Sequence, residues 1–467
     1  MLWLRIKIYE NHSMNQTWMK YLLMAFAFFL PLHALLVTTL KCRFWLDTDL
    51  FRFWKELVVI GLLFGSVYAV GKRYKWNYKK FLEWNYIVGI PIVFAIIAFI
   101  YMYFPYFKPG IHSYLGYKYD VFFLFTLIAG FSLYSVRKYF DSILRALFAS
   151  IGLILIVFLP WYLFFDISAV AGIFGYSSEV STYTANACIS FSQNVEGQHR
   201  FQWTFGWPIR FSVFLIVWLF VYVGYILDTK LTRQKKYLFI GIPTLFIFLS
   251  VFFSYSKTSI LWLFVWILIF FAIVRRYIFE TNLSEKQVKF LKFAPLILIF
   301  TAGLLVFLKR DLFTHLGSMI NRLDNLQRAV QMFFYNPIGY GVGTAWPATQ
   351  IADSIEAYSY EWAANSAQIF KYLPENWYVQ MLVEMSFVGL ALFLAILIVI
   401  GYYLFQIMKV RKTYFSVAIF TSFVTLCFMA NFTHAFEETA TSYLFFLIIW
   451  AYIAQNYGIF QKKKLLK

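Results

Sequence analysis

The chain has 467 residues, of which 61% are hydrophobic, 23% aromatic and only 13% charged. Soluble globular proteins carry charge on about a quarter of their residues, so the low charged fraction of this chain excludes a soluble globular protein. It favours a polytopic helical membrane protein. The formal net charge of +19 is by itself compatible with a nucleic-acid partner, so the distribution of that charge along the chain decides its meaning.

Twelve apolar windows follow one another along the chain, and most reach the ~17–25 residues that a helix needs to cross a bilayer. Segments with the strict alternation of membrane β-strands are absent from the sequence. We therefore predict an all-α polytopic membrane protein with about 12 transmembrane helices. Residues 1–17 are mostly polar and lack a small-residue cleavage site, which predicts an uncleaved first anchor. The windows are 18–40, 56–71, 84–104, 119–136, 143–165, 208–227, 237–253, 258–279, 293–308, 378–405, 414–433 and 439–460.

Basic residues are distributed unevenly between the segments that join these windows. If the N-terminus is cytoplasmic and the windows alternate in direction, the inner segments hold most of the 41 Lys and Arg residues, including the clusters at 72–80 and 462–467. This is the positive-inside pattern, and it accounts for the excess of charge. We predict a multi-pass protein with both termini in the cytoplasm, surrounded by membrane lipids and without a nucleic-acid partner.

Two outer loops are much longer than the shortest connection would require, at 166–207 and 309–377. No linker, repeat or low-complexity tract divides the chain, so we expect a single membrane domain over 1–467. The loop at 309–377 joins the ninth and tenth predicted helices, and long loops of this kind usually carry function. It contains an amphipathic helix at 315–336, on which Arg322 lies about 70° from the centre of the apolar face and Arg328 nearly opposite. That apolar face comprises Met319, Leu323, Leu326, Val330 and Phe333.

Four cations stand beside the outer ends of predicted helices. Arg200, Arg210 and Lys257 lie near the sixth and eighth windows, and Arg322 lies in the large loop. A cation at a helix N-terminus opposes the macrodipole, so Arg210 and Lys257 are locally unfavourable. One interpretation is that each side chain reaches the lipid headgroups. The other is that the four bind a shared anion such as a diphosphate.

A stripe of polar residues enters the tenth helix. Asn376, Gln380 and Glu384 are four residues apart, so they share one face, and Glu375 lies at the mouth of the same helix. A carboxylate such as Glu384 inside a membrane helix is costly and marks either a functional site or a structural ion pair, for example with Lys257. Glu375 meets the large loop and the outer cations, which favours it as a general base.

Two further motifs are weaker. The run at 336–347, NPIGYGVGTAWP, is not preceded by a strand, so a tight turn is favoured over a nucleotide-binding loop. His434, Glu437 and Glu438 lie at the outer junction of the last two helices. A His with a Glu three residues later is a weak metal motif, and polar lining of an outer cavity is the favoured interpretation.

Taken together, several segments of the chain resemble the O-antigen ligase/polymerase superfamily of integral membrane glycosyltransferases. They occur in the order of the family, which also has twelve helices with its longest outer loop between the ninth and tenth. The segments are FWKEL at 53–57, LGYKYD at 115–120, RFQWTFGWPIRFS at 200–212, SYSKTS at 254–259, residues 318–343, PENWYVQMLVEMSFVG at 374–389 and THAFEE at 433–438.

The resemblance implies a mechanism at the outer face of a bacterial cytoplasmic membrane. An undecaprenyl-diphosphate-linked oligosaccharide would be held by Arg210, Lys257 and Arg322, with Arg200 nearby, without a metal or other cofactor. A residue of the large loop, here Glu375, would deprotonate a hydroxyl of a glycan or lipid-linked acceptor. That hydroxyl would displace the lipid diphosphate with inversion.

The remaining polar residues of the site have supporting roles in this interpretation. Asn376, Gln380 and Glu384 would line the catalytic cavity behind Glu375, and His434 and Glu437 would add to its polar wall.

The chain departs from the family pattern at two positions. Many members have Arg where Lys257 stands, and Lys cannot form a bidentate fork. Ligases carry His-Asn where this chain has Glu375-Asn376. Polymerisation of surface polysaccharide and its ligation to another acceptor both stay open.

A different class, a transporter or flippase of lipid-linked glycans, is the alternative. Transporters favour internal repeats and polar sites at mid-bilayer, whereas here the polar residues cluster at the outer ends of helices.

Overall fold

The protein is represented by a computed structural model, which describes residues 16–44, 51, 53–73, 86–103, 111–165, 174, 176–177, 190–191, 194–195, 198–201, 205, 208–278, 317–344 and 375–459. Apart from four two-residue strands, the regular secondary structure of these residues is helical, which confirms the predicted helical class. The ninth predicted window and most of the two long loops lie outside the described residues. The helices are α2 (Gln16–Phe29), α3 (His33–Arg43), α5 (Trp54–Arg73), α7 (Tyr86–Tyr103), α8 (Ile111–Ser132), α9 (Tyr134–Lys138), α10 (Phe140–Leu153), the π-helix η1 (Ile154–Phe158), α11 (Leu159–Phe164), α13 (Pro208–Asp228), α14 (Arg233–Phe253), α15 (Lys257–Tyr277), α18 (Gly317–Tyr335), α21 (Trp377–Arg411), α22 (Tyr414–Met429) and α23 (Thr439–Gln455).

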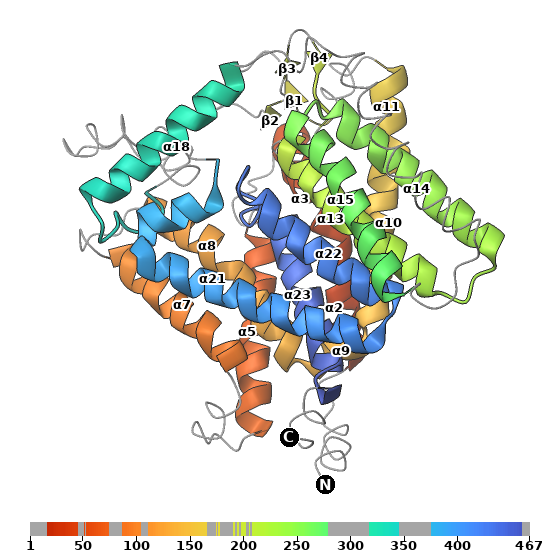
Figure 1. Cartoon of the computed structure of the whole chain (residues 1–467), viewed down its shortest axis with the longest axis horizontal. Helices are drawn as coiled ribbons and strands as arrows, with labels where there is room; N and C mark the ends of the chain where they lie inside the picture. The colour runs from red at the N-terminus through yellow and green to blue at the C-terminus, as the bar shows by residue number, and fades with distance from the viewer. Residues whose placement is uncertain are drawn as a thin grey trace.

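The short strands form two separate pairs. The strand β1 (Tyr176–Ser177) pairs in parallel with β2 (Ser190–Phe191), and β3 (Asn194–Val195) pairs antiparallel with β4 (Gln198–His199). In Figure 1 they lie at the end of the molecule where α18 also lies, whereas α5 and α23 reach toward the opposite end.

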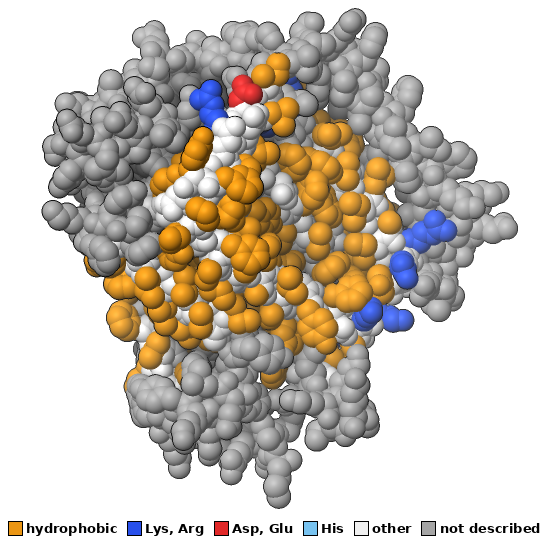
Figure 2. Space-filling model, turned by 60° about the vertical axis from the view of Figure 1, so that its left-hand side comes forward, with side chains coloured by type: hydrophobic (Ala, Val, Ile, Leu, Met, Phe, Trp, Pro, Cys, Tyr) orange, Lys and Arg blue, Asp and Glu red, His pale blue; other side chains and the backbone are white. Residues whose placement is uncertain are grey.

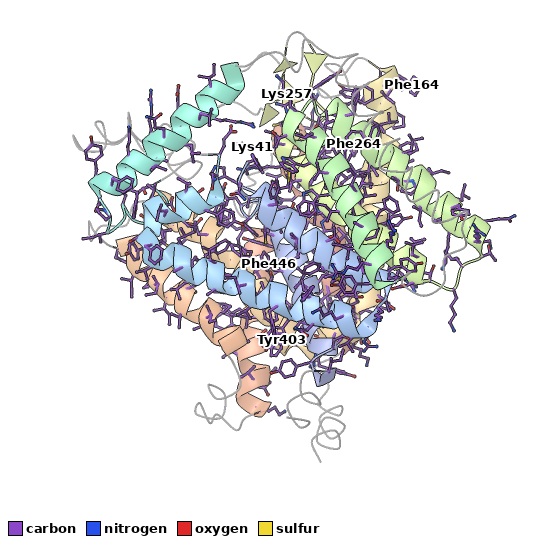
Figure 3. The ribbon with its side chains drawn as sticks, viewed as in Figure 1. Lys41, Phe164, Lys257, Phe264, Tyr403 and Phe446 are labelled. Carbon is purple, nitrogen blue, oxygen red and sulfur yellow. The ribbon has the colours of Figure 1, made fainter. Side chains whose placement is uncertain are left out.

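The helix α23 is the centre of the bundle, because all residues from Thr439 to Ile453 are buried. A helix that is apolar around its whole circumference has to be covered on every side. The helix α8 packs along it, α5 packs on α8, and α13 packs on α22. Figure 3 shows Phe446 of α23 in the middle of the packed side chains, between Tyr403 and Phe264.

Several helices can cross a membrane. Among the described residues, six helices are long and apolar enough, or seven if α2 and α3, which meet at 77°, count as one broken span. The six are Trp54–Lys72, Phe140–Phe164, Pro208–Asp228, Arg233–Phe253, Lys257–Tyr277 and Trp377–Arg411, and each overlaps a predicted window. Three other windows correspond to shorter apolar helices, so the predicted count of about 12 is not confirmed.

The outer surface has the character of a membrane protein. Figure 2 shows a broad hydrophobic area over the described part of one face, with charged side chains at its margins. Large apolar side chains such as Phe387 of α21 and Phe64 of α5 are 67% and 69% exposed. Contiguous apolar surface on this scale would promote aggregation in water, so it indicates contact with lipid.

The helix α21 is broken after its second turn. Met385 has φ −120° and Ser386 has φ +63° and ψ −174°, which interrupts the ladder of helical hydrogen bonds. The loop that follows α18 closes this break. Tyr340 N donates to Val383 O at 3.0 Å and Gly341 N donates to Glu384 O at 2.9 Å, so carbonyl groups at the break are satisfied from outside the helix.

Glycine is required in this loop. Gly339, Gly341 and Gly343 have φ of +97°, +98° and +82°, a region that residues with a side chain rarely adopt. Across the contact with α8, a Cβ on Gly116 would lie 2.2 Å from the Cα of Gly343. The predicted tight turn at 336–347 is therefore confirmed over 336–344, and its role is to seal the break in α21.

Candidate active site

The helix α18 rests on the N-terminal segment of α21, before the break. Ala329 and Met332 are buried against Val383, and Tyr340 of the glycine loop extends the same contact. The buried face is therefore rotated from the predicted one toward Arg322, and Leu323, which was placed on the buried face, is 56% exposed. The side of α18 that packs on Val383 is therefore the side of Ala329 and Met332, next to Arg322.

Arg322 points into the protein, as its position on the helix predicted. Its guanidinium forms an ion pair with Glu375 and donates from Nη1 to Thr258 Oγ1 at 3.2 Å. The side chains of Arg322 and Glu375 are 32% and 29% exposed, whereas Arg328 on the other face of α18 is exposed. Three elements that are distant in sequence thus meet at one point, namely α15, α18 and the start of α21.

Glu375 is held by the residues that begin α21. It has φ +45°, and the next residue, Asn376, caps the helix by accepting from Tyr378 N at 3.0 Å and Val379 N at 3.1 Å. Trp377 N donates to Ala430 O at 2.8 Å, which fixes the first turn to the connection between α22 and α23. The amide of Asn376 therefore has a structural task, and the carboxylate of Glu375 projects from an anchored helix start.

Arg200 lies close to this ion pair. Its Nε donates to Ser254 O at 2.7 Å, at the turn between α14 and α15. Burial, followed by the nearby charge of Arg322, lowers the pKa of Arg200 to about 10, and Glu375 opposes this shift. Two guanidinium groups that destabilise each other's charge are a favourable place for an anion.

Lys257 is the first residue of α15, next to Thr258, and Figure 3 shows it at the end of the molecule where α18 and the strands lie. The hydroxyl of Ser256 caps this helix by accepting from Ser259 N at 3.3 Å. Tyr255, just before the cap, has φ +49°. The motif SYSKTS therefore builds a tight turn before α15, in which Lys257 precedes Thr258, the residue that accepts a hydrogen bond from Arg322.

Arg210 belongs to a second, more deeply buried cluster. Its Nη2 donates to Glu437 Oε2 at 3.0 Å, and Glu437 Oε1 contacts His434 Nδ1 at 3.1 Å. Glu437 and His434 are each 2% exposed. The sequence grouped Arg210 with the other cations around one anion, whereas its described partner is a carboxylate of the protein itself.

Gln380 and Glu384 are buried between α21 and α8. They are 2% and 0% exposed, and Asp120 of α8, which is also 0% exposed, lies within electrostatic range of Glu384. The Oε1 atom of Gln380 has no hydrogen-bond partner among the described residues. The polar stripe is thus divided among a helix cap, an amide inside the bundle and a pair of carboxyl groups.

Sequence analysis did not single out four charged residues of α5 and α8, of which Lys55, Glu56 and Asp120 are buried and Lys118 is partly buried. Glu56 of α5 lies 2.9 Å from Lys118 of α8 and 3.9 Å from Lys55, and Asp120 lies on the same helix as Lys118. All four fall within FWKEL and LGYKYD, two segments that carried the family resemblance. Charged residues inside apolar windows were the signal that could have identified them.

These observations define a multi-pass helical membrane protein with a cationic polar site at one end of its bundle. A family model described as O-antigen ligase matches residues 242–394, about a third of the chain. No curated protein matches the chain. The matched region contains Lys257, Arg322, Glu375 and the sealed break of α21. It confirms the resemblance to the O-antigen ligase/polymerase superfamily, and it indicates a glycosyltransferase-like enzyme of surface polysaccharide synthesis.

Proposed function

We propose that this protein is an inverting, metal-independent glycosyltransferase that polymerises or ligates surface polysaccharide. Its donor would be an undecaprenyl-diphosphate-linked glycan at the outer face of a bacterial cytoplasmic membrane. The observation that carries the proposal is the meeting of Arg322, Glu375 and Arg200 at the ends of α15, α18 and α21. Cations for a diphosphate and a carboxylate for proton transfer stand side by side there.

The donor diphosphate would be bound by Arg200, Lys257 and Arg322. Guanidinium groups recognise phosphate oxygens through paired N–H donors, and a Lys ammonium adds a point charge, so positive charge can be supplied without a metal. Arg210, which the sequence groups with these cations, would support the site from the second cluster while it keeps its contact with Glu437. Among these cations, Arg322 is the best placed to hold the diphosphate beside the proposed base, because it contacts Glu375.

The ion pair between Arg322 and Glu375 gives the unliganded site a defined resting state. Because both side chains are about one-third exposed, the pair contributes only ~0–1 kcal/mol to stability. A diphosphate carries more charge than one carboxylate, so it competes effectively for the guanidinium. Its binding would release Glu375 from Arg322 and make the carboxylate available as a base.

The transfer step then follows from the chemistry of these groups. Glu375 accepts the proton of an acceptor hydroxyl while the hydroxyl oxygen attacks the anomeric carbon of the donor glycan. The bond from that carbon to the diphosphate oxygen breaks on the opposite face, which inverts the configuration. The lipid diphosphate leaves with its electron pair, stabilised by the arginines, and Glu375 later returns its proton to water.

The test is a reconstituted reaction with purified protein and a defined lipid-diphosphate oligosaccharide. Chain extension on the lipid carrier indicates a polymerase, and transfer to a separate lipid-linked acceptor indicates a ligase. The anomeric configuration of the product reports inversion, and unchanged turnover after treatment with a chelator supports the metal-free mechanism. Absence of both products from folded protein that binds the donor would contradict the proposal.

The orientation in the membrane can be tested independently. If the more basic connecting segments are cytoplasmic, α18 would lie outside and the end of α21 inside. Cys42 is disulfide-bonded, which fits an outward position for the end of α3, because disulfides persist in oxidising compartments. In a Cys427→Ser background, a membrane-impermeant maleimide should label Arg328→Cys in intact cells and Lys412→Cys only after permeabilisation. The reverse pattern would invert the topology.

A further inference from the structure

Two buried serines join α13 to the turn between α14 and α15. Ser212 of α13 and Ser254, the residue that follows α14, are both 0% exposed, and their hydroxyl oxygens lie 2.7 Å apart. Ser254 Oγ donates its single hydrogen to Val251 O at 2.6 Å, so Ser212 is the donor in the contact between the two hydroxyls. A hydrogen bond between side chains thus attaches the turn to α13.

The hydroxyl of Ser254 is fully used by the protein. Besides its hydrogen bond to Val251 O, it accepts one from Ser212 Oγ and one from Ser256 N at 3.3 Å. A serine hydroxyl has one hydrogen and two acceptor positions, so its hydrogen-bonding capacity is satisfied. The same group therefore holds the backbone of the turn in shape and links the turn to a neighbouring helix.

The turn at 254–258 reaches all three cations that are assigned to the donor diphosphate. Arg200 Nε donates to the carbonyl of Ser254 at 2.7 Å. Lys257 is the first residue of α15 and belongs to the turn itself. Arg322 Nη1 donates to Thr258 Oγ1 at 3.2 Å. The positions of the three cations therefore depend on the position of one five-residue segment.

The proposed base is held by a different set of contacts. Trp377 N donates to Ala430 O at 2.8 Å, and Asn376 caps α21 directly after Glu375. These contacts attach the start of α21 to the connection between α22 and α23, and not to α13. Loss of the contact between the two serines should therefore displace the cations more than the base.

We propose that Ser212 and Ser254 are positioning residues, which hold the turn at 254–258 so that the three cations converge on the diphosphate of the donor. Neither serine touches substrate, because both are fully buried. The inference rests on the proposed function, since that function assigns the cations to a diphosphate. It adds two residues that determine the affinity for the donor without contacting it.

The decisive variant is Ser212→Ala. It removes only the hydroxyl that reaches the turn, whereas Ser254 keeps its hydrogen bonds with Val251 O and Ser256 N. The Kd for a defined lipid-diphosphate oligosaccharide should rise by about tenfold, the upper scale of one net hydrogen bond. The diphosphate is bound before and during the transfer, so the loss falls on binding and kcat should change by less than about threefold. Inorganic diphosphate, measured as a competitor, should lose affinity by the same factor.

Two control variants separate positioning from stability. Ser250→Ala removes a buried hydroxyl one turn earlier on α14, which has no hydrogen-bond partner among the described residues. Ser422→Ala removes a buried hydroxyl that joins α22 to α13, where it donates to Val217 O at 2.9 Å. We expect Ser422→Ala to lower the midpoint of thermal unfolding about as much as Ser212→Ala does. Both controls should keep the Kd values of the unsubstituted protein.

Ser254→Ala tests the same contact from the other side. It removes the acceptor for Ser256 N as well as the contact with Ser212, so its Kd should exceed that of Ser212→Ala. Because both serines act through one hydrogen bond, the double variant Ser212→Ala/Ser254→Ala should bind the donor as well as Ser254→Ala alone. Additive losses in the double variant would mean that the two hydroxyls act independently, which contradicts the proposal.

The outcomes distinguish this inference from the proposed function. If folded Ser212→Ala binds the donor as tightly as Ser422→Ala, or loses only kcat, the positioning role is wrong and the proposed function stands. If Ser212→Ala does not fold, the comparison of Ser254→Ala with Ser250→Ala gives the same decision. If the unsubstituted protein binds neither the lipid-linked donor nor inorganic diphosphate, the proposed function and this inference both fail.

Discussion

The two ion-pair clusters of this protein differ in how far their charged side chains are exposed. Arg322 and Glu375 are each about one-third exposed and lie on two elements that start or end in long loops. Arg210 and Glu437 are 14% and 0% exposed in their side chains, and His434 completes the second cluster. An exposed pair can exchange partners at little cost, whereas opening a buried pair leaves a charge without compensation.

The type of residue alone therefore does not identify a substrate-binding cation, because Arg210 and Arg322 have different surroundings. The sequence presents Arg210 and Arg322 as equivalent groups at the outer ends of helices. Their surroundings assign one to a contact that a diphosphate can replace and the other to a contact that holds α13 to the start of α23. The following predictions test this difference between the two clusters.

The largest effect is expected at the base itself. Glu375→Gln keeps the shape of the side chain and removes its basicity, so turnover should fall by ~10²–10⁴-fold, the usual contribution of general-base catalysis. Donor affinity should survive, because the diphosphate is bound by other residues, and Glu375→His should retain some activity. Turnover and donor affinity are measured on the same purified protein. Near-normal turnover would remove Glu375 from the mechanism, and a matching loss of affinity would make it a binding residue.

The buried cluster should respond in stability. Glu437→Ala leaves the guanidinium of Arg210 without its carboxylate in a buried position, which typically costs about 3–5 kcal/mol. We expect a low yield of folded protein and a lowered midpoint of thermal unfolding. Arg322→Ala is the matched control, since it opens the exposed pair and should leave the midpoint nearly unchanged. Equal midpoints in the two variants would show that the clusters do not differ as described.

For catalytic activity we expect the opposite order, with the larger loss at the exposed pair. Arg322→Ala removes a cation from the proposed diphosphate site and should cost ~1.5–3 kcal/mol of transition-state stabilisation, measured from kcat/KM. Arg328→Ala, on the exposed face of α18, should have no such effect. A loss of activity in Arg328→Ala with normal activity in Arg322→Ala would mean that the substrate lies on the other side of α18.

Much of the architecture could be predicted from the sequence, because apolar windows and helix caps are local signals. The windows that correspond to α13, α14, α15 and α21 are such cases, and the inward side of Arg322 followed from helical spacing. The number of spans could not be predicted equally well. A helix such as α23, buried on every side by the protein, and a helix such as α14, of which only 17% of the apolar window is buried, produce similar apolar windows.

The site could be predicted only in part, because partners are set by long-range packing. That Glu375 and Arg322 would meet was favoured by their places around one loop, but their direct ion pair was not foreseen. Asp120, which lies within electrostatic range of Glu384, is 264 positions earlier in the chain, and periodicity gives no information on such a neighbour. The same holds for Arg210 and Glu437, whose pairing depends on how α13 packs beside the start of α23.

The smallest effect, and the finest test of the site, concerns Asn376. Its Oδ1 atom accepts hydrogen bonds from two backbone N–H groups at the start of α21, and removing such a cap typically costs about 1 kcal/mol. Asn376→Ala should therefore loosen the first turn, displace Glu375 and lower kcat moderately. Asn376→Ser restores a cap with a shorter side chain and should recover most of the loss. Equal losses of kcat in Asn376→Ser and Asn376→Ala, with normal thermal stability of both proteins, would contradict this role. The amide of Asn376 would then contact the sugar substrate directly, in addition to capping the helix that follows Glu375.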